Sequence, residues 1–508
     1  MSEAPIAGTS NAPSSPSGSS TPSSSAGSSK PIVSPVILGG DIGAYSLART
    51  FHEAYGIKPL VLSQANSHLC HDSSILENRV NPQLDNVDVL MQTLKDVAVE
   101  KQGETLMVLA CGDWYVRLLV EHRAELEEAG YILPYISEEL LNRLVLKDSF
   151  YEICEECGVP YPKTAVFDTQ APVDPATFGL TFPVVAKPAS SAEYHYAKFP
   201  GKKKVFIFDA PEQLAEMLDN LCASSYKGKF LLQEFIPGDD TNMRILTTYS
   251  DRTGKMRFAS FGQTVLEDPR PQAIGNPMAI ISRECDEAVE CARRLTEHVG
   301  YTGFANYDIK VNPETGKFVF FEINTRLGRS NYYVTAAGDN TIRWIVEDLV
   351  EGRDFPDEVQ VARGRKSLYT VLPKSILVEH VQDPALRAEV QQLFAEGHAK
   401  NPINYPAEKK LVRKLYPYYF EQKQKKSLRE FYKAEAARKA AEAAGGARAD
   451  GEGAGYAPAG EGAAVQGTAG DAGVAPKKPV SPKGYVTVPG PDADTASTAD
   501  AAAKGGDR

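Results

Sequence analysis

The sequence predicts an α/β fold, because apolar segments of strand length alternate along the chain with segments of helical periodicity. Residues 31–63 begin this alternation with a strand, a glycine-containing turn, an amphipathic helix and a second strand, a βαβ unit. Residues 303–324 form two strand-like segments around the turn Pro313-Glu-Thr-Gly316, the pattern of a β-hairpin. These two observations indicate a parallel unit at the start of the chain and an antiparallel pair further along it.

Both ends of the 508-residue chain have compositions that do not support a packed core. Residues 1–32 are almost entirely Ser, Pro, Ala and Gly, and residues 436–508 are rich in Ala and Gly with scattered charges. Such segments bury too little apolar surface to offset the conformational entropy that folding removes. We expect both tails to be disordered.

The body between the tails divides into three expected parts. Residues 33–140 form a small N-terminal α/β domain, residues 141–355 a second domain that contains the hairpin, and residues 356–435 a helical and basic C-terminal segment. Gly112 and Asp113 follow an apolar strand of the first domain, where they form either a loop on the substrate side or a simple turn.

Charge and hydropathy limit the partners and the location. The net charge of −11 argues against a nucleic-acid-binding protein. No apolar stretch approaches the roughly 20 residues of a membrane span. The N-terminus also lacks the basic start and apolar core of a secretion signal. We therefore expect a cytoplasmic protein.

Residues 409–433 differ from the rest of the acidic chain, because they are strongly basic and contain many aromatic residues. One interpretation is a peripheral segment that contacts anionic lipid at the inner face of the cell membrane, or another polyanion. The other is a solvated helix whose aromatic side chains pack on the body. The sequence leaves both open.

Three polar side chains occupy alternate positions at the end of an apolar strand. In a strand, Glu322, Asn324 and Arg326 point the same way. A buried carboxylate needs a counter-charge or a metal ion. A surface ion pair between Glu322 and Arg326 is the simpler interpretation. The hairpin favours the metal, because it brings Asp308 beside Glu322 and Asn324, and three hard oxygen ligands suit Mg²⁺, with Mn²⁺ as an alternative.

A site for Mg²⁺ and phosphate also needs cations from elsewhere in the chain. Lys187 lies in an apolar strand, where an unpaired ammonium would be costly. Lys147 begins a helical segment, and a solvated surface lysine is an equally good interpretation of it. Arg326 would reach phosphate oxygens as a fork-shaped donor.

The segment Gln233-Glu234-Phe235-Ile236 ends another apolar strand. Its backbone N–H and C=O groups are suited to bind an adenine edge, while Phe235 and Ile236 pack on the ring. Asp240, just beyond the following turn, is placed to accept from ribose hydroxyls.

Taken in order over residues 147–340, these pieces resemble the ATP-grasp superfamily of carboxylate–amine ligases. The resemblance implies a two-lobed ATP-grasp module preceded by a small α/β domain, with ATP and Mg²⁺ bound by the residues named above. Gln233 stands where many members of that superfamily carry Glu, so either Gln233 or Glu234 would face the nucleotide.

Longer motifs over residues 35–420, such as LGGDIGAYSLARTFHEAYG, FIPGDDTNMRIL and FEINTRLGRSNYYVT, are similar to the D-aspartate ligases of Gram-positive bacteria. That resemblance implies activation of the β-carboxylate of D-aspartate by ATP. The activated carboxylate is then joined to the side-chain amine of a peptidoglycan precursor peptide.

The resemblance also implies roles for individual residues. Lys187 and Arg326 would be catalytic, stabilising the transferred phosphoryl group and the oxyanion that follows. Ser190 and Ser191 would lie in a loop that closes over the phosphates. From their position next to the strand that carries Glu322 and Asn324, and not from the resemblance, Arg329 and Ser330 are expected to hold the α-carboxylate of the amino acid.

Two other functions agree with the same sequence. A ligase of this fold could act on another amino acid or acceptor, because the residues that bind ATP are common to such ligases and the sequence does not identify the residues that line the substrate pocket. A non-catalytic protein that binds a polyanion or a membrane surface could retain the ATP-grasp fold as a scaffold.

Overall fold

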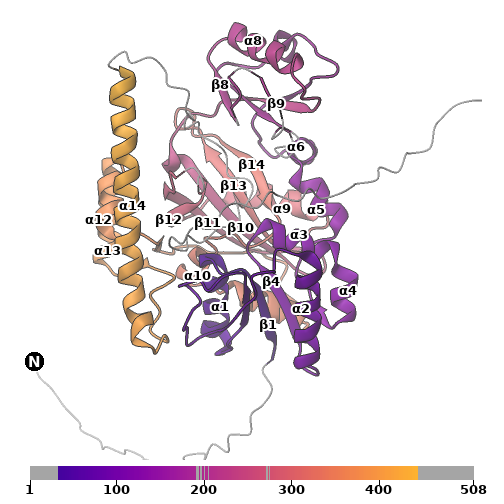
Figure 1. Cartoon of the computed structure of the whole chain (residues 1–508), viewed down its shortest axis with the longest axis vertical. Coiled ribbons are helices and arrows are strands. Elements are labelled where there is room, and N and C mark those ends of the chain that lie inside the picture. The colour runs from indigo at the N-terminus through magenta and orange to yellow at the C-terminus, as the bar shows by residue number, and fades with distance from the viewer. Residues whose placement is uncertain are drawn as a thin grey trace, which may run out of the picture. The chain divides into compact units, whose positions relative to one another are not determined.

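The computed structural model describes residues 32–443, apart from residues 190–193, 195–196, 200, 204, 271–272 and 274. The described residues belong to one compact unit, Met1–Val465. They form helices and three β-sheets, which confirms the α/β class (Figure 1).

The first sheet is parallel and has the strand order β3-β2-β1-β4-β5. Its elements, in chain order, are β1 (Ser34–Leu38), α1 (Ile42–Tyr55), β2 (Leu60–Ser63), β3 (Glu77–Val80), α2 (Val87–Glu100), β4 (Leu106–Ala110), α3 (Asp113–Glu121), α4 (Arg123–Glu128) and β5 (Tyr131–Ile132). The unit β1-α1-β2 confirms the predicted βαβ pattern. β1 is buried along its whole length, as its continuous apolar sequence requires.

A second sheet has the order β14-β13-β10-β11-β12-β16-β17, with β15 paired to β11. Its strands are β10 (Met243–Ser250), β11 (Met256–Glu267), β12 (Pro277–Arg283), β13 (Gly303–Val311), β14 (Phe318–Asn324), β15 (Gln360–Val361), β16 (Leu368–Thr370) and β17 (Ala399–Lys400). β13 and β14 pair antiparallel around the turn, which confirms the predicted hairpin.

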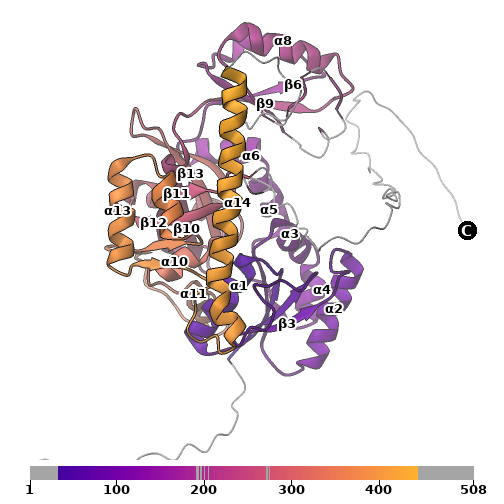
Figure 2. The same cartoon turned by 60° about the vertical axis from the view of Figure 1, so that its left-hand side comes forward.

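A third, antiparallel sheet has the order β6-β9-β7-β8. It consists of β6 (Thr164–Asp168), β7 (Val184–Pro188), β8 (Phe206–Phe208) and β9 (Lys229–Glu234). Leu214, Leu218 and Leu221 of α8 (Pro211–Cys222) pack on Phe230 and Leu232 of β9, which gives this sheet a separate apolar core (Figure 2).

The remaining helices connect or cover the sheets. They are α5 (Glu138–Val145), α6 (Lys147–Glu156), α9 (Asp286–His298), α10 (Tyr332–Ala336), α11 (Thr341–Leu349), α12 (Lys374–His380), α13 (Pro384–Ala395) and α14 (Leu411–Ala443), with 3₁₀ turns η1 (Pro175–Phe178) and η2 (Asp240–Asn242). Within the described residues, no helix is long and apolar enough to cross a membrane.

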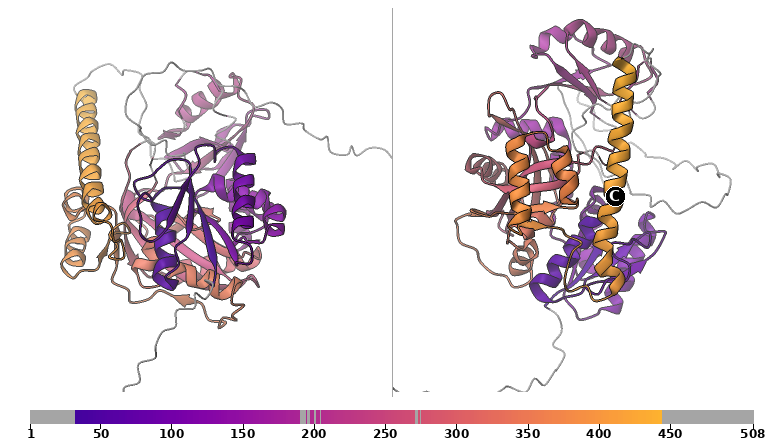
Figure 3. Two further views of the ribbon diagram at one scale, coloured as in Figure 1. Left: turned by 60° about the horizontal axis from the view of Figure 1, so that its bottom comes forward. Right: turned by 90° about the vertical axis from the view of Figure 1, so that its left-hand side faces the viewer.

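Helix α14 is longer than the sequence analysis predicted. Residues 436–443 were assigned to the C-terminal tail, but they continue this helix to Ala443 (Figure 3). The assignment was wrong because the segment is rich in Ala, Glu, Lys and Arg, which have high helix propensity, and not in Gly.

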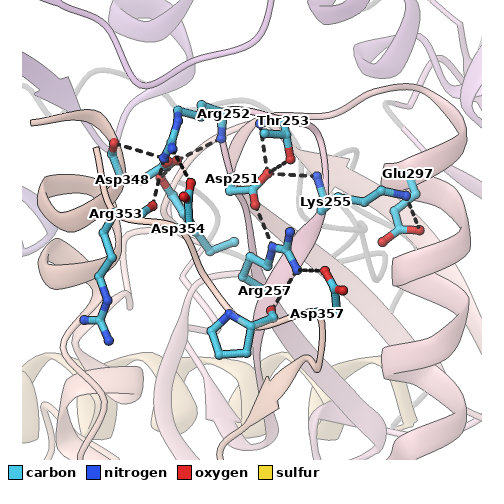
Figure 4. Close-up of polar contacts among 12 residues, drawn as sticks. Asp251, Arg252, Thr253, Lys255, Arg257, Glu297, Asp348, Arg353, Asp354 and Asp357 are labelled. Carbon is cyan, nitrogen blue, oxygen red and sulfur yellow. Dashed lines mark hydrogen bonds and ion pairs between the residues drawn. The ribbon is translucent and has the colours of Figure 1, made fainter. Parts of the chain in front are cut away.

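Charged side chains join the β10–β11 turn to the end of α11 (Figure 4). The buried Asp251 accepts a hydrogen bond from Arg257 Nε at 2.6 Å. Asp348, whose side chain is fully buried, accepts from the Tyr249 hydroxyl and from the backbone N–H of Arg252, both at 2.8 Å. Each carboxylate is satisfied by neighbours within the fold, so this charged cluster is structural.

A buried ion pair holds the start of α14 against the first sheet. Arg413 lies 3.2 Å from Glu408 Oε1, and both side chains are almost completely buried. The same carboxylate accepts from the Tyr45 hydroxyl at 2.9 Å, the Ser73 hydroxyl at 2.7 Å and the Ser74 N–H at 2.7 Å. Segments far apart in sequence therefore meet at one fully hydrogen-bonded carboxylate.

This arrangement predicts that Glu408→Ala lowers the free energy of unfolding by about 3–5 kcal/mol, because Arg413 would stay buried without its carboxylate. Denaturant unfolding of the full chain measures the loss. Lys410→Ala is the matched control, since Lys410 forms a largely exposed pair with Asp72 at the same junction and should cost less than about 1 kcal/mol. Equal losses in the two variants would contradict the assignment.

Candidate functional site

Two carboxylates face each other across the β13–β14 hairpin. Asp308 pairs with Glu322 in the strand register, and Asn306 pairs with Asn324. Burial, followed by the neighbouring Glu322 carboxylate, raises the pKa of Asp308 well above its ordinary value. The structure thus brings Asp308 and Glu322 together as expected, with Asn324 two residues further along the same strand.

These side chains fit a divalent cation. Glu322 is 8% exposed, and its Oε1 atom is buried with no hydrogen-bond donor among the described residues. A cation would satisfy this oxygen and relieve the repulsion from Asp308. No group of three His, Cys, Asp or Glu side chains suited to a metal occurs within the described ranges. The hairpin carries two carboxylates and the amide oxygen of Asn324, which also accepts a hydrogen bond from Arg326 at 3.4 Å. This set is compatible with Mg²⁺ that keeps waters and phosphate oxygens as further ligands.

Lys147 contacts one of these two acids, Glu322. It begins α6, and its Nζ donates to Glu322 Oε2 at 3.0 Å. The interpretation of Lys147 as a solvated surface lysine is therefore wrong. The interpretation of Glu322 and Arg326 as a surface ion pair is wrong as well, because Glu322 pairs with Lys147 and Arg326 pairs with Asp113.

Lys187 lies on β7 and is 6% exposed. Burial, followed by the nearby Lys147 ammonium, lowers its pKa to about 7. Its Nζ donates to Gln233 Oε1 at 3.2 Å, and Gln233 Nε2 donates in turn to the hydroxyls of Tyr151 and Thr164, both at 2.9 Å. This network fixes the orientation of the glutamine amide, so that its oxygen faces the lysine.

Gln233 and Glu234, between which the sequence left the choice open, have different partners in the structure. Gln233 is buried on the side of Lys187, whereas Glu234 Oε1 accepts from the Thr181 N–H at 2.8 Å and lies 3.7 Å from Lys163 Nζ. The two side chains point to opposite faces of β9, as neighbours in a strand must. Gln233 is therefore the one that faces the cationic site.

Residues 233–236 form the hinge segment, and two of its backbone N–H groups already donate hydrogen bonds within the protein. The N–H of Glu234 donates to the Lys163 carbonyl at 3.0 Å, and the N–H of Phe235 donates to the Pro183 carbonyl at 2.9 Å. The side chains of Phe235 and Ile236 are half-buried. These two N–H groups hold residues 234 and 235 in the small sheet, so an adenine edge would have to bind the other backbone groups of residues 233–236.

The sequence analysis missed Lys310. This residue is 1% exposed; its Nζ donates to the Gly238 carbonyl at 2.9 Å and lies 5.6 Å from the centre of the Phe235 ring. Lys310 therefore connects the hairpin to the hinge segment. A signal was available, because Lys310 follows Asp308 by two positions and so shares its strand face.

Asp240 and Glu267 lie close to Lys310. Asp240 Oδ2 accepts from the Glu267 N–H at 3.1 Å, and burial raises the pKa of Asp240. Burial, followed by the Asp240 carboxylate, raises the pKa of Glu267 to about 8. One oxygen of Asp240 is thus engaged by the protein, and Glu267 is a further acidic residue that sequence reasoning did not find.

Both arginines after β14 contact acids of the first sheet. Arg326 Nε donates to Asp113 Oδ1 at 2.5 Å, and Arg329 Nε lies 3.5 Å from Asp41 Oδ2. Asp41 caps α1 and Asp113 begins α3, so both acids stand beyond the carboxyl ends of parallel strands, where α/β sheets bind ligands. Ser330 is 5% exposed beside them.

The backbone at Gly43 lies very close to Cys111 and Arg329. A Cβ atom at Gly43 would lie 2.9 Å from the Cβ of Cys111 and 3.3 Å from the Cα of Arg329. Glycine therefore lets α1, the end of β4 and the loop after β14 meet at one point. The two remaining predicted residues, Ser190 and Ser191, lie outside the described residues.

Comparisons with known proteins identify the family of this chain. The family model "Carbamoyl-phosphate synthase L chain, ATP binding domain" matches residues 276–338, which contain the hairpin and the two arginines. The D-aspartate ligase of Enterococcus faecium (strain Aus0004) is 34% identical over 391 residues, which cover 75% of this chain and 92% of that protein.

More distant proteins are also similar. The D-alanine–D-alanine ligase of Ectopseudomonas mendocina (strain ymp) is 26% identical over 249 residues, covering 45% of this chain and 72% of its own length. Among solved structures, an L-amino acid ligase from Bacillus licheniformis is 15% identical, covers 65% of this chain and 78% of its own, and has a TM-score of 0.46. On the identity and coverage of the Enterococcus protein, the chain belongs to the D-aspartate ligase family and is an ATP-dependent carboxylate–amine ligase of the ATP-grasp superfamily.

Proposed function

We propose that this protein joins the β-carboxylate of D-aspartate to the side-chain amine of a peptidoglycan precursor peptide, using ATP. The 34% identity to a protein named D-aspartate ligase supports this substrate. The contact that supports the chemistry most directly is the 3.0 Å hydrogen bond from Lys147 to Glu322. It joins a cation suited to phosphate with a carboxylate suited to a metal.

In the first step, a carboxylate oxygen of the amino acid attacks the γ-phosphorus of ATP, and ADP leaves. The ammonium groups of Lys147 and Lys187 neutralise charge on the phosphates. Asp308, Glu322 and Asn324 would hold Mg²⁺, or Mn²⁺ in its place, which when bound supplies further positive charge to the β- and γ-phosphates. The product is an acyl phosphate, which carries the activation for the second step.

In the second step, the neutral amine of the acceptor attacks the acyl carbon, and inorganic phosphate leaves as the amide forms. The nitrogen loses its proton to water or to the departing phosphate. Arg326 stabilises the oxyanion of the tetrahedral species, held in orientation by Asp113. Ser190 and Ser191 contact the phosphates of ATP.

The remaining roles concern binding. Glu234, Phe235 and Ile236 hold the adenine, Gln233 orients Lys187 toward the phosphates, and Asp240 holds the ribose. Arg329, which pairs with Asp41, and Ser330 bind the α-carboxylate of the amino acid.

The proposal includes the partners and the location expected from the sequence. The substrates are small molecules, an amino acid and a precursor peptide, and no nucleic acid takes part. The reaction belongs in the cytoplasm, where ATP is made. Contact with a membrane surface concerns residues 409–433 and rests on separate observations.

The substrate is tested by ADP release from ATP and Mg²⁺ in the presence of single amino acids. We expect release with D-aspartate and much slower release with L-aspartate, and a new amide, detected by mass spectrometry, when a lysine-containing precursor peptide is added. ADP release with another amino acid but not with D-aspartate would overturn the substrate assignment and leave the ligase assignment intact.

We expect Glu322→Gln to lower kcat at least about a hundredfold, because the variant loses a charged metal ligand and the partner of Lys147. Excess Mg²⁺ should restore part of the loss, which a titration of rate against Mg²⁺ measures. Glu314→Gln, in the exposed turn of the same hairpin, is the control and should leave kcat unchanged. Full activity of Glu322→Gln would refute the metal assignment.

The low pKa of Lys187, about 7, predicts a pH dependence of ATP binding. Below pH 7 the free enzyme carries the ammonium, and above it the amine is neutral and attracts phosphate less. The dissociation constant of ATP should therefore rise as pH increases through 7 and above. Calorimetric titration across pH 6–9 measures this rise, and Lys187→Met should bind weakly with little pH dependence. An unchanged pH profile in that variant would contradict the role of Lys187.

A further inference from the structure

The start of α14 carries a concentration of exposed apolar side chains. Fourteen large hydrophobic residues are exposed in the described part of the chain, and five of them fall within residues 411–419. Their spacing of i, i+1, i+4, i+7 and i+8 puts them on one side of the helix. They are Leu411, Val412, Leu415, Tyr418 and Tyr419, with exposed fractions of 71%, 59%, 59%, 68% and 57%.

The opposite side of α14 packs on the body. Leu428 is fully buried, and Tyr416, Phe420 and Tyr432 are half-buried against the core. The aromatic residues of this segment are thus divided between the two interpretations that the sequence left open, some facing the body and some facing solvent. The exposed apolar side is a second apolar face of the helix, because the first is already occupied.

Contacts along the helix keep the exposed face turned outward. The buried pair of Glu408 and Arg413 fixes its first turn. Further along, Arg429 pairs with Glu379 of α12 at 2.6 Å, and the ring of Tyr432 stacks on His380 of α12 at 4.0 Å; α12 and α14 lie beside each other in Figure 1. Turning the apolar face inward would break all these contacts.

Lysines lie beside the exposed apolar residues and on the same side of the helix further along it. Residues 409–433 contain nine Lys and Arg against two Glu, in a chain whose net charge is −11. Successive helical residues are 100° apart, so Lys423 and Lys426 lie on the same side as the apolar group, one to two turns beyond it. The exposed Lys409, Lys410 and Lys414 flank the apolar group at its N-terminal end. The face is therefore both apolar and cationic.

We propose that this face of α14 binds the surface of a lipid bilayer that contains anionic phospholipid, with the helix parallel to the surface. We define the lipid-binding face as Leu411, Val412, Leu415, Tyr418 and Tyr419 together with Lys409, Lys410, Lys414, Lys423 and Lys426. The aliphatic side chains enter the boundary between headgroups and acyl chains, the tyrosines keep their hydroxyls at the polar level, and the lysines contact lipid phosphates.

The charge favours lipid over a second copy of the chain. Two copies that met symmetrically through this face would bring their lysines together, and like charges repel. An anionic bilayer has an apolar interior for the aliphatic side chains and negatively charged headgroups for the lysines. None of the residues in the lipid-binding face is among those assigned to ATP, the metal or the amino acid, so lipid binding leaves the ligase reaction unchanged.

Co-sedimentation of the full chain with vesicles tests the proposal. We expect binding to vesicles of equal parts phosphatidylcholine and phosphatidylglycerol, weakened by salt, and much weaker binding to phosphatidylcholine alone. The double variant Val412→Glu, Leu415→Glu should lower the partition coefficient about tenfold or more, and Lys423→Glu, Lys426→Glu should also lower it.

Val99→Glu is the matched control, because Val99 is a 76% exposed valine on α2, and it should leave partitioning unchanged. Vesicle-free ADP formation that equals the wild type in every variant shows that each one is folded. The proposal is overturned by a wild-type protein that stays in the supernatant with anionic vesicles, or by apolar-to-Glu variants that still bind. Sedimentation velocity that shows a lipid-independent dimer, dissociated by the same substitutions, would assign the face to a second copy and also overturn it.

Discussion

The site depends on one arrangement, the pairing of Asp308 with Glu322 across a hairpin. Burial, and after it the neighbouring Glu322 carboxylate, raises the pKa of Asp308 well above its ordinary value, because both disfavour the charged form of Asp308. Lys147 supplies one positive charge through its contact with Glu322. Oε1 of Glu322 has no hydrogen-bond partner among the described residues, and a divalent cation would satisfy it.

Different elements supply the other charged groups. The small antiparallel sheet contributes Lys187 and orients it through Gln233, while the first sheet contributes Asp41 and Asp113, which hold the two arginines after β14. Each arginine thus has a carboxylate partner before any substrate arrives. A substrate carboxylate or phosphoryl group competes with that partner, and this competition favours ligands that carry more than one negative oxygen.

Much of this organisation could be predicted from local patterns. The alternation of Glu322 and Asn324 in a strand, and a turn that brings Asp308 opposite, are short-range features, and the predicted hairpin carries them. Lys310 lies two positions after Asp308 on the same strand face, but the sequence did not identify it as a site residue, because its partner Gly238 is 72 residues away. The partners of Arg326 and Lys147 are 213 and 175 residues away, and such contacts leave no local signal. The end of α14 was misjudged because alanine is frequent in tails as well as in helices.

The position of Glu408 late in the sequence affects how the protein folds during its synthesis. Tyr45 and Ser73 leave the ribosome 363 and 335 residues before the side chain that completes their hydrogen bonds. The surface around Tyr45 and Ser73 therefore stays uncovered until residue 408 has been translated. Chaperone protection is needed most in that interval, and a chain that stops before residue 408 would retain the same uncovered surface permanently.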